Sequence, residues 1–198
     1  MSIGFVFECG PQGADKQVCE YLAGQLLPGI QFISRTLDNK LKLLDGAAEI
    51  AKDLLADGCE RVLIVWDLRP AWPDKKEKPC RAAERQTLLE SLVKEELQDK
   101  PVYLVCVEQE LESWLLASEH AISAYLSTSA HAYEAKRVKK PDRERQPKAV
   151  MNNYFQEARG RPYEDRVHAV SVLKAAPLDL RRLRRSVSFA RFESKLLA

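Results

Sequence analysis

The sequence predicts an α/β fold built on a four-stranded, mainly parallel sheet. Four short apolar runs supply the strands, at residues 3–7, 31–34, 62–66 and 102–107. Stretches with the apolar spacing of helices lie between these runs, and this alternation is typical of a parallel sheet flanked by helices. A chain of 198 residues is long enough to bury one sizeable core with a small additional region.

The elements of the first half follow one another closely. After the first apolar run, residues 11–13 turn the chain, and residues 15–26 have the spacing of an amphipathic helix. The run at 31–34 is the weakest of the four, which predicts an edge strand. A helix over about 39–57 then leads directly into the strand at 62–66, as expected for a short connection in a βαβ unit.

The next segment is a polar loop with three prolines, residues 68–80. Because it leaves the carboxyl end of a strand, we expect it to form a mobile flap over a site at that edge. A helix over about 81–98, the strand at 102–107 and a short helix over about 110–117 complete the body.

Beyond residue 118 the helical pattern becomes weaker. Short helices are expected near 119–126, 147–158, 163–175, 178–183 and 189–197. The basic stretch 136–146 is expected to be an exposed loop.

The charge of the chain changes sign along the sequence. Residues 1–130 carry 14 Lys and Arg against 21 Asp and Glu, whereas residues 131–198 carry 17 against 8, so the net charges are −7 and +9. We therefore expect an α/β domain over 1–130 and a mostly helical, basic extension over 131–198 packed on it. The basic region could bind a polyanion, or the two regions could neutralise each other within one fold.

The composition is that of a cytoplasmic protein with reduced cysteines. No apolar stretch reaches the roughly 18 residues of a membrane span, and the N-terminus lacks the basic segment of a signal peptide. The five cysteines are an odd number and include no CxxC pair, which disfavours a disulfide framework. No membrane association is expected.

Carboxylates follow three of the apolar runs. Glu8 follows the first run, Asp67 follows the third, and Glu108, Glu110 and Glu112 follow the fourth. Since the carboxyl ends of parallel strands form the ligand-binding edge of a sheet, we expect these groups to meet in one crevice. Like charges at close range are costly unless a cation lies between them. Oxygen ligands select Mg²⁺ or Mn²⁺ over zinc, so the pattern predicts a magnesium or manganese site.

Each carboxylate also has a structural interpretation. Glu8 could be a surface acid at the start of a helix, and Asp67 could form a salt bridge with Arg69. Glu110 and Glu112 cannot share one helical face, so we expect only one of them to reach the site.

Other chemistries have less support in the sequence. The three histidines, at 120, 131 and 168, lack the spacing of metal ligands, and no serine lies in a nucleophile-elbow motif. The glycines after the first strand form neither a GxGxxG motif nor a P-loop.

Basic residues of the second half are candidates for binding phosphate. Lys148 could hold a phosphate group, although a lysine at a helix start is usually solvated. Arg181, Arg182, Arg184 and Arg185 could bind nucleic acid or a partner protein, or form a solvated helix face.

A family resemblance rests on segments spread over the chain. They are residues 7–11, 65–72, 110–117, 147–148 and 188–192. Among them, the Glu-Gly turn after the first strand, the aspartate after the third and the acidic motif after the fourth look like the TOPRIM fold, a Rossmann-like α/β fold found in topoisomerases, primases and overcoming-lysogenisation-defect nucleases. They are more closely similar to a bacterial TOPRIM-like domain family of unknown function, which is often associated with ATPases and phage-defence loci.

The resemblance implies roles for particular residues. Glu8 would be the general acid or base, and Asp67 would bind the metal as the first aspartate of a DxD motif. Arg69 replaces the second aspartate, so it would contact phosphate, while Glu110 or Glu112 could supply the missing metal ligand. If neither does, the site would be a phosphate-binding relic.

These observations lead to a principal hypothesis and alternatives. The principal one is Mg²⁺-dependent hydrolysis of phosphodiester bonds in nucleic acid, by a TOPRIM-like nuclease that serves as a phage-defence effector. The main alternative is a catalytically inactive TOPRIM-like module that binds a partner ATPase or nucleic acid. Hydrolysis of a small phosphorylated metabolite is a third option, and self-association is compatible with each.

Overall fold

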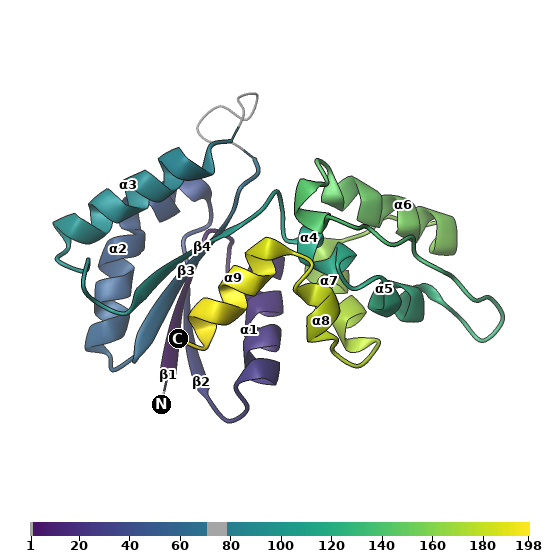
Figure 1. The fold of residues 1–198 in the computed structure, drawn as a ribbon, viewed down its shortest axis with the longest axis horizontal. Coiled ribbons are helices and arrows are strands. Elements are labelled where there is room, and N and C mark those ends of the chain that lie inside the picture. The colour runs from purple at the N-terminus through teal and green to yellow at the C-terminus, as the bar shows by residue number, and fades with distance from the viewer. Residues whose placement is uncertain (1, 71–78) are drawn as a thin grey trace. The chain divides into compact units, whose positions relative to one another are not determined.

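The computed structural model describes residues 2–70 and 79–198 (Figure 1). The chain forms two compact units: unit 1 contains Met1–Val107 and Phe192–Ala198, and unit 2 contains Glu108–Arg191. The boundary after residue 107 differs from the expected one after residue 130, because the helices that follow the last strand pack with the later helices. Residues 71–78 of the expected flap lie outside the described residues.

Unit 1 is built on a four-stranded, all-parallel sheet. Its strands are β1 (Ser2–Phe7), β2 (Gln31–Thr36), β3 (Arg61–Asp67) and β4 (Val102–Val107), in the order β2-β1-β3-β4. The predicted α/β class is thereby confirmed, and β2 is an edge strand as expected. The central strands β1 and β3 are almost wholly buried, which explains why both are continuous apolar runs.

Helices cover both faces of this sheet. Strand β1 alternates, so that Val6 packs into the core formed with α2 (Lys40–Ala56) and α3 (Arg81–Lys94), while its neighbours Phe5 and Phe7 point to the other face. On that face lie α1 (Ala14–Leu26) and the end of α9 (Val187–Leu196), as Figure 1 shows. The rings of Phe5 and Phe192 stack there with centroids 6.4 Å apart.

The sequence determines how closely α2 approaches the sheet. A Cβ atom at Gly4 would lie 3.0 Å from Val62 Cγ2 and 3.1 Å from Leu54 Cδ1, so a larger residue would push the helix away. The helix begins after Asn39, whose side chain accepts a hydrogen bond from the Lys42 amide at 3.0 Å.

Unit 2 is mostly helical, which confirms the expected character of the C-terminal region. Its helices are α4 (Glu112–Leu116), α5 (Glu119–Leu126), the 3-10 helix η1 (Pro141–Arg143), α6 (Pro147–Arg159), α7 (Asp165–Lys174), α8 (Leu180–Leu183) and the beginning of α9.

Two segments of the family resemblance meet in the core of unit 2. Trp114 is fully buried, and its indole N–H donates to the Ser188 hydroxyl at 2.9 Å. The ring of Phe189 packs edge-on against Trp114 with centroids 5.6 Å apart. Asp142 accepts a hydrogen bond from the Ser188 amide at 2.8 Å and so caps the start of α9. Trp114 of the segment 110–117 therefore packs and hydrogen-bonds within this unit with Ser188 and Phe189 of the segment 188–192.

Within residues 2–70 and 79–198, no helix is long and apolar enough to cross a membrane.

Candidate functional site

Glu8 and Asp67 lie at the carboxyl ends of the two central strands. Asp67 is the last residue of β3, and Glu8 follows β1 and continues its pairing through a 3.3 Å hydrogen bond from its amide to the Val65 carbonyl. The Glu8 carboxylate accepts a hydrogen bond from the backbone N–H of Asp67. The structure thus brings these two residues together at the edge where parallel sheets bind ligands.

The environment of Glu8 favours its neutral form. Burial raises the pKa of Glu8 from 4.5 to about 8, and the negative charges of Asp15 and Glu84 add to this effect, whereas Lys40 opposes it. Its Oε2 atom is buried and has no hydrogen-bond partner among the described residues. A buried carboxylate oxygen in this condition is costly unless it is protonated or meets a cation or a donor.

A buried ion pair supports this edge of the sheet. Lys40, the first residue of α2, places its ammonium 3.2 Å from Glu84 Oε1, and both side chains are less than 10% exposed. The other oxygen of Glu84 accepts the indole N–H of Trp66 at 2.9 Å. Sequence reasoning missed this pair. The sequence signal that could have indicated a buried acceptor was Trp66, because a buried indole N–H needs a hydrogen-bond acceptor.

Lys40 also anchors the chain that follows Asp67. Its ammonium donates to the carbonyl oxygens of Leu68 at 2.9 Å and Pro70 at 2.7 Å. The half-buried Arg69 lies between these two residues. Its expected salt bridge with Asp67 and its expected phosphate contact both stay predictions.

The turn after β1 is tightly packed around Cys9. The Gly13 amide donates to the Gly10 carbonyl at 2.8 Å, and a Cβ atom at Gly13 would lie only 2.3 Å from Cys9 Sγ. Burial raises the pKa of the Cys9 thiol to about 12, and the charge of Asp15 adds to this. This raised pKa favours the neutral thiol form of Cys9 at neutral pH.

Unit 2 brings together three other predicted site residues, Lys148, Glu110 and Glu112. The Lys148 ammonium lies 2.5 Å from Asp165 Oδ2. Burial alone would lower the pKa of Lys148, but this hydrogen bond and the charges of Glu112 and Glu110 raise it above 10.5. Lys148 thus interacts electrostatically with both glutamates, whereas the sequence predicted a phosphate contact for it, with a solvated lysine as the alternative. Asp165 was not predicted, and no spacing in the sequence relates it to residue 148.

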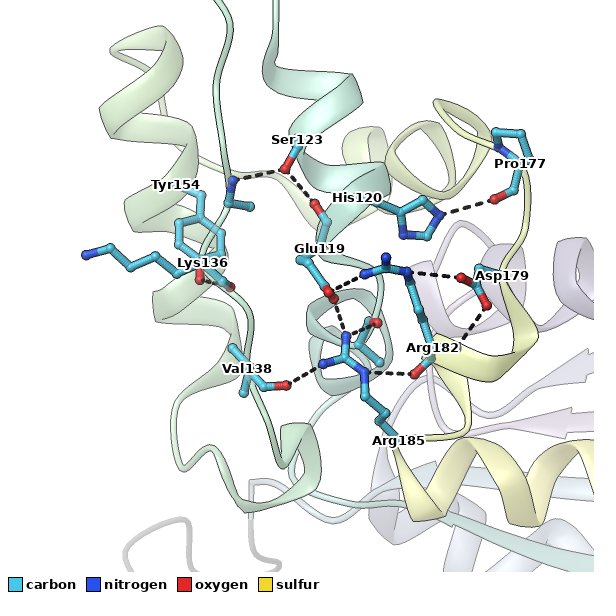
Figure 2. Close-up of polar contacts among 12 residues, drawn as sticks. Glu119, His120, Ser123, Lys136, Val138, Tyr154, Pro177, Asp179, Arg182 and Arg185 are labelled. Atoms are coloured by element: carbon cyan, nitrogen blue, oxygen red, sulfur yellow. Dashed lines mark hydrogen bonds and ion pairs between the residues drawn. The ribbon is translucent and has the colours of Figure 1, made fainter.

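Two of the predicted arginines take part in ion pairs within unit 2 (Figure 2). Glu119, which is only 7% exposed, receives Arg182 Nη1 on one carboxylate oxygen and Arg185 Nη2 on the other. Arg181 and Arg184 are exposed. At the beginning of this unit, Glu108 forms a 2.9 Å salt bridge with Arg191.

The described residues contain no ready-made metal centre, because no three His, Cys, Asp or Glu side chains among them are grouped closely enough to hold an ion. Glu8 and Asp67 belong to unit 1, whereas Glu110 and Glu112 belong to unit 2. A metal site that combines the two pairs stays a prediction.

One comparison with known proteins identifies a family. Residues 16–197 match the family described as a domain of unknown function, DUF4276. No match was found among curated proteins or among solved structures.

Proposed function

We propose, from the premise that the chain belongs to the DUF4276 family, that it is a TOPRIM-like, Mg²⁺-dependent phosphodiesterase acting on nucleic acid. One observation carries the proposal. Asp67 ends β3, Glu8 directly follows the neighbouring parallel strand β1, and burial raises the pKa of Glu8 there to about 8. Perturbed carboxyl groups at such an edge are typical of functional sites.

The residues of this edge fit Mg²⁺ or Mn²⁺. Mg²⁺ is commonly held by one or two carboxylates, with water and substrate phosphate completing its coordination, so a preformed cluster of three protein ligands is not required. Asp67 supplies one carboxylate for the ion, and the buried Glu8 Oε2 atom at the same edge, which has no hydrogen-bond partner among residues 2–70 and 79–198, would contact a water molecule bound to it. A bound Mg²⁺ or Mn²⁺ ion would supply charge stabilisation to a phosphoryl oxygen and acidify a water molecule.

The surrounding side chains would perform the remaining steps. Glu8 holds a proton near neutral pH, so it can donate one to a leaving oxygen or, once ionised, accept one from the attacking water. Lys40 fixes the Leu68 and Pro70 carbonyls, and with them the backbone on either side of Arg69. Arg69 would then contact a phosphate of the substrate at this edge, and Lys148 would bind a phosphate within unit 2.

A polyanionic substrate agrees with the charge distribution. Unit 2 carries 16 Lys and Arg against 11 Asp and Glu, which gives a net charge of +5. Positive charge on unit 2 would attract nucleic acid to the protein. A role in phage defence, with an ATPase partner, belongs to the same proposal through the TOPRIM-like resemblance.

Isothermal titration of Mg²⁺ and Mn²⁺ tests the proposal. We expect specific binding to the wild-type protein and its loss in Asp67→Asn, followed by metal-dependent cleavage in a screen of DNA and RNA substrates. The screen is run with and without a candidate ATPase partner, and Glu8→Gln should lose cleavage while keeping most metal binding. Wild-type protein that binds neither ion would contradict the proposal.

A specific observation favours the second candidate, an inactive module that binds a partner ATPase or nucleic acid. The Lys40 ammonium lies close enough to lower the pKa of Glu8, so the edge already contains a cation of its own. In that case Glu8 and Asp67 would need no metal. Unchanged binding of nucleic acid or ATPase in Asp67→Asn, together with no metal binding, would favour this candidate.

A further inference from the structure

Unit 2 contains a cavity lined mainly by arginines. Its volume is about 370 Å³, and the residues that line it are Arg137, Asp179, Arg181, Arg182 and Arg185. Arg184 was grouped with these arginines by sequence but does not line the cavity. A cavity of this size is within the range that holds small ligands.

Hydrogen bonds fix two of the four guanidinium groups (Figure 2). Arg185 donates to the carbonyl oxygens of Ala117 at 2.6 Å and Val138 at 3.1 Å, and it pairs with the buried Glu119. Arg182 pairs with the other oxygen of Glu119. Because these two side chains are already ordered, little conformational entropy would be lost when a ligand contacts them.

The aspartate in the lining is occupied as well. Asp179 Oδ1 accepts the Arg182 amide at 3.1 Å, and Oδ2 accepts Arg182 Nε at 3.0 Å. Both Asp179 carboxylate oxygens thus hold Arg182 in position, and neither is left for a cationic ligand. The remaining two arginines, Arg137 and Arg181, are exposed, so their guanidinium groups can adjust to a ligand.

The charged side chains at the cavity have a net charge of +2. Four guanidinium groups face two carboxylates, those of Asp179 and Glu119. A phosphate monoester carries a charge of about −1.5 to −2 near neutral pH, whereas an internal phosphodiester carries about −1. Guanidinium groups also match phosphate oxygens in geometry.

We propose that this cavity binds the terminal phosphate of a nucleotide or nucleic-acid strand, a phosphate monoester rather than an internal diester. The binding involves only residues of unit 2 and needs no metal ion. It extends the proposed function, since hydrolysis of a phosphodiester produces such an end, but it does not depend on the chemistry at Glu8 and Asp67.

Isothermal titration in the presence of EDTA tests this proposal. The probes are AMP, inorganic phosphate, adenosine and the dinucleotide ApA, which contains only a diester. We expect AMP and phosphate to bind, and adenosine and ApA to bind at least about tenfold more weakly. Arg137→Gln and Arg181→Gln should each weaken AMP binding about tenfold.

The matched control is Arg184→Gln, which removes the same charge from an exposed position next to α8 but outside the cavity. Its AMP affinity should equal that of the wild type. Thermal unfolding checks that the three variants remain folded. We expect them to do so because all three side chains are exposed.

Three results would overturn the proposal: no binding of AMP or phosphate up to about 1 mM, equal binding of AMP and ApA, or equal weakening by Arg184→Gln. The Asp67→Asn protein separates the two proposals. AMP binding retained in that variant supports the cavity whatever the result of the metal titration, and AMP binding lost in it contradicts an independent cavity.

Discussion

Burial gives Glu8 a different ionisation in the folded and unfolded protein. Its pKa is about 8 in the folded state and near 4.5 when exposed. Between these values the folded protein holds a proton that the unfolded chain releases. Unfolding therefore becomes more favourable as the pH rises from about 4.5 to 8, and above pH 8 the full penalty of a buried, ionised carboxylate is present.

The substitution Glu8→Gln should remove this penalty. We expect the variant to be more stable than the wild type at pH 9, by on the order of 2 to 4 kcal/mol, and to differ little at pH 4.5. Urea unfolding at both pH values measures the difference. The control is Glu60→Gln, an exposed carboxyl group next to the opposite end of β3, which should change stability little at either pH. A variant that is less stable than the wild type at pH 9 would show that the Glu8 carboxylate is stabilised.

Position 13 needs a glycine because the Cys9 side chain leaves no space for a Cβ atom, and not because of its backbone angles. A Cβ atom there would lie 2.3 Å from Cys9 Sγ and 2.4 Å from Cys9 Cβ, while the φ of Gly13 is an ordinary −65°. Gly13→Ala should therefore destabilise the protein by about 1 to 3 kcal/mol. Adding Cys9→Gly should recover part of the loss. Gly46→Ala, at an open position in α2, should instead stabilise by about 0.5 to 1 kcal/mol, and thermal unfolding distinguishes the three proteins.

At the scale of elements, one buried ion pair joins two helices and a strand. Lys40 belongs to α2, Glu84 to α3, and Trp66, which donates to Glu84, to β3. Lys40→Met would leave Glu84 buried without its cation and should cost about 3 to 5 kcal/mol. The double variant Lys40→Met with Glu84→Gln should recover much of this loss, because the amide oxygen can still accept the Trp66 N–H.

A solvent-exposed pair at the start of the same helix provides the comparison for that measurement. Lys42 and Asp38 are 3.1 Å apart, with side chains 58% and 57% exposed. Lys42→Met should cost less than about 1 kcal/mol in the same urea titration. Equal costs for Lys40→Met and Lys42→Met would mean that burial of the first pair does not determine its contribution.

The elements were largely predictable because hydrophobic periodicity is local. The strand predicted at 102–107 has those bounds, and the helix predicted at 39–57 is α2. The helix predicted to reach residue 98 ends at Lys94, because Glu96 adopts a φ of 59° and Leu97 bonds back to the Leu92 carbonyl. Glutamate rarely takes this conformation, so the sequence contained no signal for that end.

The candidate site was predictable only in part. Glu8 and Asp67 could be found because the carboxyl ends of parallel strands meet at one edge. The ion pairs Lys40–Glu84 and Lys148–Asp165 depend on how helices pack, and the partners are 44 and 17 residues apart in the chain. No spacing rule connects such residues, and a lysine at a helix start is normally expected to be solvated.

At the scale of the whole molecule, the chain leaves unit 1 after Val107 and returns to it at Phe192. Residues 192–198 therefore complete a unit whose four strands all lie within residues 2–107. Phe192 is fully buried and stacks on Phe5, the Lys195 ammonium donates to the Leu104 carbonyl, and Arg61 donates to the Leu196 carbonyl at 2.9 Å. Unit 1 cannot reach its full stability until the C-terminus has been added.

The substitution Phe192→Ala tests this dependence within the intact chain. Removing a fully buried ring leaves a cavity beside Phe5, and we expect a loss of about 3 to 5 kcal/mol. Hydrogen exchange should become faster in peptides from β1 and β3, since their amides belong to the weakened unit. Leu197→Ala, at a position that is 50% exposed, is the control and should leave that exchange unchanged. Undiminished protection of β1 in Phe192→Ala would mean that the sheet is stable without the returning helix.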